Sequence, residues 1–88
     1  MSQREMEIVN RLGLHARAAA QFVQLAARYK SDVFIEKDGE EINGKSIMGI
    51  LMLAAPQGTL IRVRTQGEDE DAALDALEKL VHGKFGED

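Results

Sequence analysis

The 88-residue chain has no cysteine, which excludes disulfide bonds and thiolate metal sites. Its two histidines cannot complete a zinc ligand set by themselves, so we expect no metal and a fold held by core packing.

No run approaches the roughly 18 apolar residues of a membrane span, and the first residues lack the apolar stretch of a secretion signal. We therefore expect a cytoplasmic protein without membrane insertion, built as one domain over residues 1–88.

Aromatic residues are also scarce, and charge is unevenly distributed. A net charge of -4 and an aromatic content of 5% argue against a nucleic-acid partner. Residues 10–31 contain no Asp or Glu and carry +4, and residues 44–66 contain none and carry +3. We expect these two segments to form one positive surface for an anionic ligand or an acidic partner, with the acidic segments facing away. A chance distribution in a short chain is the alternative.

The spacing of apolar residues predicts four strands and three helices. Strands are expected at residues 4–9, 32–37, 40–43 and 59–65, and helices at residues 16–29, 47–53 and 69–81. Asp38-Gly39 tolerates the positive φ angles of a type I′ turn, so the strands beside it are expected to pair antiparallel. The run 47–53 could be a helix or a buried strand, and Ser46 as an N-cap favours the helix.

This β-α-β-β-α-β-α order predicts an α+β protein. One sheet with its helices on a single face is the economical way to bury three amphipathic helices. We therefore expect an open-faced β-sandwich, in which a four-stranded antiparallel sheet is covered on one face by three helices and its other face is in water.

His15 stands where a glycine turn meets an alanine-rich helix. The first N–H groups of that helix, at Ala16 and Arg17, lack internal partners and carry partial positive charge, so they favour anions such as phosphate. The same charge disfavours a protonated imidazole and leaves a nitrogen lone pair as a nucleophile. The Arg17 guanidinium can bridge two phosphoryl oxygens. The alternative is a surface or N-capping histidine without chemistry.

Two motifs of this chain resemble those of the HPr family, the histidine phosphocarriers of the bacterial phosphoenolpyruvate-dependent sugar phosphotransferase system. The sequence GLHAR at residues 13–17 resembles the family's phosphorylation-site motif. The sequence GKSIMGI at residues 44–50 resembles its second motif, at the matching distance. The resemblance extends over nearly the whole chain, including its length and its order of elements.

This resemblance implies that His15 accepts a phosphoryl group on Nδ1 from enzyme I and passes it to enzyme IIA components of a sugar or nitrogen-branch system. It also implies that Arg17 clamps the phosphoryl group, and that no cofactor is needed because positioning and positive charge stabilise the transition state. The family usually has proline directly after this arginine, where the chain has Ala18. We expect Ala18 to leave the first helical turn more flexible, with an effect on rate or partner choice.

Ser46 has two predicted roles. It is expected to cap the helix at residues 47–53, and the resemblance implies that it is a regulatory phosphorylation site for an HPr kinase/phosphorylase, as in some family members. A phosphate at a helix start is tolerated by the fold, and its charge would repel an acidic partner.

The short helix that follows Ser46 is rich in apolar residues. Two turns cannot bury Ile47, Met48, Leu51 and Met52 together. We therefore expect Ile47, Met48 and Leu51 to bind partner proteins near His15, since adaptable methionines suit a surface that docks several partners. Core packing is the alternative.

Residues 39–46 also match the pattern G-x-x-x-x-G-K-S of a nucleotide-binding P-loop. Glu40 and Glu41 would place two negative charges against the bound phosphates, and Asp38-Gly39 is better explained as a hairpin turn. The chain is also too short for the parallel sheet and magnesium-binding acid of such an enzyme. Nucleotide hydrolysis is therefore disfavoured.

The leading hypothesis is a monomeric HPr-like phosphocarrier, a transferase component that turns over only with its partner proteins. The first alternative is a regulatory protein of the same fold, whose phosphorylation at His15 or Ser46 controls partner enzymes or transcription factors. The second is an unrelated αβ interaction domain in which both motifs are coincidental.

Overall fold

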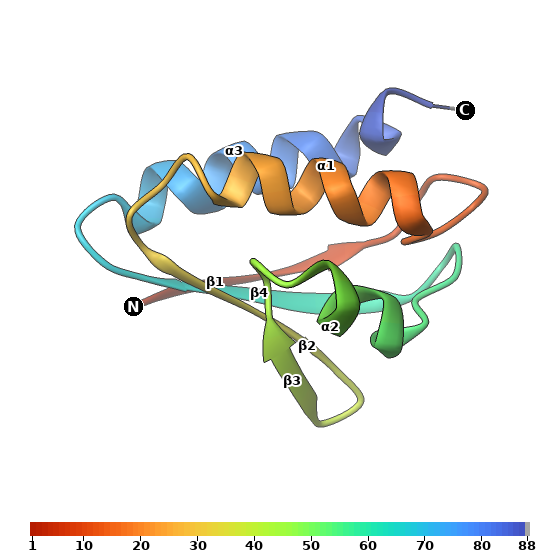
Figure 1. The fold of residues 1–88 in the computed structure, drawn as a ribbon, viewed down its shortest axis with the longest axis horizontal. Coiled ribbons are helices and arrows are strands. Elements are labelled where there is room, and N and C mark those ends of the chain that lie inside the picture. Colours follow the sequence, from red (N-terminus) through yellow and green to blue (C-terminus); the bar gives the residue numbers. More distant parts are fainter. Residues whose placement is uncertain (88) are drawn as a thin grey trace.

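Within residues 1–87, which the structure describes, four strands and three helices form in the predicted order. The structure is a computed structural model, shown in Figure 1. Its elements are β1 (Ser2–Glu7), α1 (Ala16–Ala26), β2 (Asp32–Lys37), β3 (Glu40–Asn43), α2 (Ile47–Leu53), β4 (Leu60–Gln66) and α3 (Glu70–His82). A short 3₁₀ helix, η1 (Lys84–Gly86), follows α3 and is not predicted by the sequence pattern.

The strands form one antiparallel sheet in the order β1-β4-β2-β3. The register places Met6 opposite Ile61 and Ile35 opposite Val63, and all four side chains are buried under the helices. Helices α1 and α3 lie side by side over this face, and α2 packs against α1 and β3 (Figure 1). The predicted α+β architecture, an open-faced β-sandwich with three helices on one face of four antiparallel strands, is confirmed.

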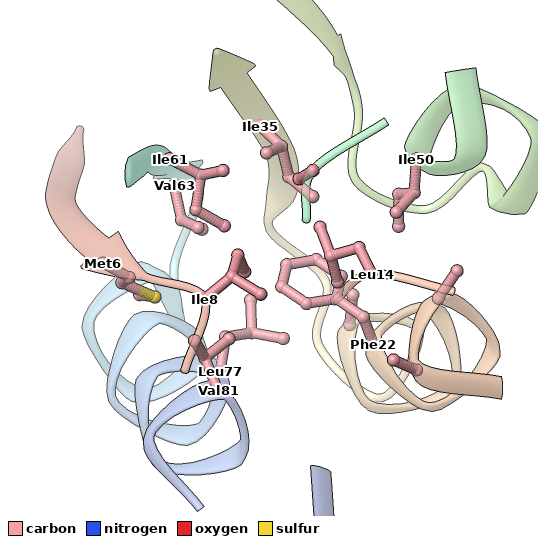
Figure 2. Packing of buried hydrophobic residues seen from close by; sticks show 14 of the residues in the cluster. Met6, Ile8, Leu14, Phe22, Ile35, Ile50, Ile61, Val63, Leu77 and Val81 are labelled. Carbon is pink, nitrogen blue, oxygen red and sulfur yellow. The ribbon is translucent and has the colours of Figure 1, made fainter. Parts of the chain in front are cut away.

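Apolar side chains from the inner sheet face and from all three helices form a single core cluster (Figure 2). The helices contribute Ala18, Ala19, Phe22 and Ala26 from α1, Ile50 and Leu53 from α2, and Leu74, Leu77 and Val81 from α3. Phe22 has no exposed surface and points from α1 into the cluster. Phe85 of η1 also belongs to the cluster and is 3% exposed. The C-terminal segment is therefore anchored in the core.

The β2–β3 hairpin turns at Asp38-Gly39, as predicted. Both residues have positive φ angles, 51° and 83°, as a type I′ turn requires. Residues Glu40–Asn43 then form strand β3, paired with β2. Because a strand occupies the middle of the P-loop pattern, its backbone cannot wrap around phosphates, and that match is coincidental.

Helix α1 ends at Ala26, so its predicted extension to Tyr29 is wrong. The amide of Tyr29 bonds to the carbonyl of Ala26 at 3.1 Å, in a tight last turn. The Asp69 carboxylate then accepts hydrogen bonds from the backbone amides of Lys30 at 2.8 Å and Ser31 at 2.9 Å. The Ser31 hydroxyl, which also donates to it, is the main cause of a lowered Asp69 pKa. The Asp69 carboxylate, which lies just before α3, therefore binds the backbone directly after α1 and ends that helix.

Strand β1 lies two residues earlier than predicted, at Ser2–Glu7 rather than 4–9. The Met1 amino group lies 2.8 Å from the Glu70 carboxylate at the start of α3. Hydrogen bonds to Glu70 from this amino group, the Gly67 amide and the Ser2 hydroxyl lower the pKa of Glu70 to about 2. These contacts hold the N-terminus against α3, so β1 begins at Ser2. The other differences are smaller, since β4 and α3 each begin one residue later than predicted.

Candidate functional site

The turn before α1 depends on glycine at position 13. Gly13 has a φ of 71°, and a Cβ atom there would lie 2.7 Å from the Ala55 carbonyl oxygen and 2.8 Å from the Pro56 Cα atom. The next amide, of Leu14, donates to the same Ala55 carbonyl at 2.9 Å. Only glycine combines this conformation with such a close approach. The turn is therefore fixed against Ala55 and Pro56, and it leads directly into the start of α1.

His15 is the N-cap residue of α1. Its backbone is extended, with a ψ of 179°, and its carbonyl accepts the first helical hydrogen bond, from Ala19 at 2.8 Å. Its side chain makes no capping bond and remains 28% exposed. The N–H groups of Ala16 and Arg17 belong to the first turn, where they have no helical acceptor. The imidazole and these donors therefore lie at one exposed end of the helix.

The ring of His15 contacts a carboxylate that sequence reasoning missed. Its Nε2 atom lies 2.9 Å from Oε2 and 3.1 Å from Oε1 of Glu87. Asn10, which is fully buried, donates through Nδ2 to Glu87 Oε1 and to the Gly13 carbonyl, each at 2.8 Å. The hydrogen bonds from Asn10 and then His15 lower the pKa of Glu87, against the opposing effect of burial. Glu87 is therefore held as a carboxylate against one ring nitrogen.

This contact corrects the prediction that the acidic segments face away from His15. The 3₁₀ helix η1, which directly precedes Glu87, lies at the same end of the molecule as the start of α1, as Figure 1 shows. Glu87 belongs to the acidic segment 67–88 and nevertheless binds the histidine. The contact joins residues 72 positions apart, so no local pattern could have indicated it.

Arg17 is exposed on the first turn of α1. Its charge contributes to lowering the pKa of Glu87, although less than the hydrogen bonds do, so its guanidinium lies in the electrostatic reach of the His15–Glu87 pair. Within residues 1–87, the Arg17 side chain makes no hydrogen bond or ion pair. The guanidinium is thus available to an anion that approaches the helix start.

An apolar surface adjoins the histidine. A shallow hollow beside it is lined by Leu12, Leu14, His15, Ala54, Ala55 and Pro56. The C-terminal end of α2 borders this hollow, and the Lys37 ammonium donates to its last carbonyls, at Leu53 and Ala54. The residues predicted to contact partners are exposed, with exposed fractions of 41% for Ile47, 69% for Met48 and 37% for Leu51, and Met52 is 75% exposed.

Ser46 caps the other end of α2. Its Oγ atom accepts a hydrogen bond from the Gly49 amide at 3.1 Å, so the predicted N-cap is confirmed. The side chain is half-buried. The buried residues of α2 are Ile50 and Leu53. Its other large apolar side chains lie on its outer surface, at Ile47, Met48, Leu51 and Met52.

Neither a metal centre nor a membrane helix is found in the described part of the chain. Among residues 1–87, no three His, Cys, Asp or Glu side chains gather as metal ligands would. No helix in the same residues has the length and the hydropathy needed to cross a bilayer.

Comparison with known proteins gives the family. Residues 2–82 match the family described as "PTS HPr component phosphorylation site". The phosphocarrier protein HPr of Neisseria meningitidis serogroup A is 51% identical over 87 residues, which are 99% of this chain and 98% of the relative. The chain belongs to the HPr family. HPr proteins are phosphocarriers of the phosphotransferase system.

Other HPr relatives agree in sequence and in fold. The HPr-like protein Crh of Bacillus subtilis is 51% identical over 81 residues, covering 92% of this chain and 95% of Crh. The crystal structure of HPr-C-His from Thermoanaerobacter tengcongensis superimposes with a TM-score of 0.97 at 45% identity, covering 100% of this chain and 99% of that one. Ala18, which follows Arg17, is fully buried in the core of this chain.

Proposed function

We propose that this chain is a monomeric, cytoplasmic, single-domain phosphocarrier that accepts a phosphoryl group from phosphorylated enzyme I and donates it to enzyme IIA components. The observation that carries the proposal is the arrangement of His15. Its imidazole is part-exposed at the start of α1, beside the amides of Ala16 and Arg17, which have no helical acceptor.

The transfer step needs no other group on this chain. The Nδ1 lone pair attacks phosphorus, the bond from phosphorus to the donor's leaving atom breaks, and that electron pair stays with the donor. The reverse sequence delivers the group to an acceptor. The amides of Ala16 and Arg17 and the Arg17 guanidinium offset the negative charge of the phosphoryl oxygens during both steps.

The partner surface in this proposal is the apolar region beside His15. Ile47, Met48 and Leu51 are exposed on α2, whose C-terminal end borders the hollow that His15 lines. Enzyme I and enzyme IIA domains would cover this surface while Nδ1 enters their reacting centre. Exposed apolar area rimmed by polar residues is typical of surfaces that bind other proteins.

The proposal is tested by incubating the chain with phosphoenolpyruvate and enzyme I and measuring its intact mass. We expect one added phosphate, which acid removes and which passes to an enzyme IIA domain added afterwards. A chain that gains no phosphate from a competent enzyme I would contradict the proposal. A chain that is phosphorylated but donates to no enzyme IIA domain would favour the regulatory role instead.

Arg17→Glu is expected to slow phosphoryl transfer by about 100-fold, because a carboxylate replaces the cation that faces the phosphoryl oxygens. The thermal midpoint should stay near that of the wild type, since the Arg17 side chain is exposed. Stopped-time phosphorylation by enzyme I and a thermal melt measure the two effects. Arg28→Glu makes the same charge change just beyond the other end of α1 and should leave the rate unchanged. An unfolded Arg17→Glu chain would assign Arg17 a structural role.

A second, regulatory function is favoured by the position of Ser46 at the start of α2. The relative Crh is likewise named HPr-like and not HPr. A phosphate on Ser46 would replace the hydroxyl as acceptor for the Gly49 amide, beside the proposed partner surface. With an HPr kinase/phosphorylase and ATP, we expect one acid-stable phosphate, which is absent in Ser46→Ala and present in Ser2→Ala. Transfer from enzyme I to the serine-phosphorylated chain should be slower. An unmodified wild-type chain would remove this regulatory role.

A further inference from the structure

Residues 84–87 turn the chain back toward His15 after α3. Lys84, Phe85 and Gly86 have φ angles of 60°, 55° and 74°, a run of left-handed residues that reverses the chain after α3. This conformation is unfavourable for the two non-glycine residues. Burial of the Phe85 side chain in the core offsets that cost, and the Glu87 amide bonds to the Lys84 carbonyl at 3.0 Å. The position of Glu87 is therefore fixed by packing rather than left to a free tail.

The contacts around Glu87 define which ring nitrogen carries a hydrogen. A carboxylate only accepts hydrogen bonds, and both of its oxygens lie within 3.1 Å of His15 Nε2. The Asn10 amide donates to the same carboxylate and is itself fully buried, which restricts the carboxylate to one orientation. A neutral imidazole in this position must carry its hydrogen on Nε2 and its lone pair on Nδ1.

We propose that Glu87 is a positioning residue for phosphoryl transfer, whose carboxylate holds the hydrogen of His15 on Nε2 and so keeps the nucleophilic lone pair on Nδ1. The proposal rests on the phosphocarrier function given above. A carboxylate on the far nitrogen of a reacting histidine is a known way to select a tautomer and to orient the ring.

Glu87 also acts on the charge that the transfer creates. When Nδ1 forms its bond to phosphorus, the ring becomes positively charged, because the hydrogen stays on Nε2. The Glu87 carboxylate faces this nitrogen and stabilises the cation, while the phosphoryl group is on the other nitrogen of the ring. The donor keeps the electron pair of its broken bond, so no further reactant is needed.

The first test reads the tautomer in the free protein. The ¹⁵N chemical shifts of the His15 ring, measured at a pH where the ring is neutral, should show a protonated Nε2 and an unprotonated Nδ1. In Glu87→Gln the two shifts should move toward each other, because a neutral amide can accept from Nε2 or donate to it. Glu68→Gln makes the same charge change before α3, at an exposed site, and should leave both shifts unchanged.

The second test is kinetic. Glu87→Gln is expected to lower the maximal rate of phosphorylation by enzyme I by about tenfold with little change in KM, because fewer chains present the Nδ1 lone pair. Wild-type shifts that place the hydrogen on Nδ1, or a Glu87→Gln chain with wild-type shifts and rate, would overturn the role of Glu87. A wild-type chain that is not phosphorylated at all would overturn the phosphocarrier function instead, and the ¹⁵N shifts would still report whether Glu87 selects the tautomer.

Discussion

His15→Ala is expected to abolish phosphorylation of the chain by phosphoenolpyruvate and enzyme I. The methyl group of alanine provides no nucleophile, and the amides of Ala16 and Arg17 can bind an anion but cannot form a bond to phosphorus. The loss should be complete within the sensitivity of intact mass spectrometry. Stability should change little, because the His15 side chain is part-exposed and makes no capping bond to α1.

The chain offers a matched control for this experiment in its second histidine. His82 is exposed at the end of α3, and His82→Ala should gain one acid-labile phosphate as the wild type does. The opposite pattern, with phosphate on His15→Ala and none on His82→Ala, would move the site to α3. Phosphate on both variants would show that the label is not confined to either histidine.

Phe22→Ala is expected to destabilise the fold by about 3–5 kcal/mol, the range for removing a fully buried aromatic ring. The Phe22 side chain has no exposed surface and lies in the cluster that joins the sheet to the helices (Figure 2). A domain of this size has a total stability of roughly 0.05–0.15 kcal/mol per residue, so the loss is a large fraction of it. The thermal midpoint should fall by at least about 12 °C.

Phe34→Ala makes the same chemical change on the open face of the sheet. Phe34 is half-buried, and the Arg64 guanidinium lies 4.5 Å from the centre of its ring. Circular dichroism during urea unfolding of both variants should show the smaller loss for Phe34→Ala, because less apolar surface returns to water there. Equal losses would mean that the helix-covered face does not hold the main core.

Under the proposed function, a chain of 88 residues carries phosphate without enclosing a substrate, and the packing of α1 is compatible with this. Apolar side chains of α1 such as Phe22 face the sheet and hold the helix in place. At the start of α1 the imidazole is part-exposed, next to amides that have no helical acceptor. The proposed function therefore assigns any further groups around the phosphoryl group to the partner protein.

Most of the fold can be predicted from local sequence patterns. Alternation of Ile61 and Val63 with Arg62 and Arg64 predicts a strand with one buried face, and Asp38-Gly39 predicts the hairpin beside it. Ser46 predicts the start of α2. These signals succeed because each depends on the conformational preference of a few adjacent residues or on a simple period.

Local sequence patterns predict the architecture, the placement of His15 at a helix start, and two motifs, at residues 13–17 and 44–50, that resemble those of the HPr family. The end of α1 and the carboxylate that meets the histidine depend instead on tertiary packing, because Asp69 binds the chain after α1 and Glu87 binds His15. Both results have the same cause. Hydrogen bonds between residues about 40 or more positions apart follow from how the packed elements bring their ends together, and no local preference encodes them.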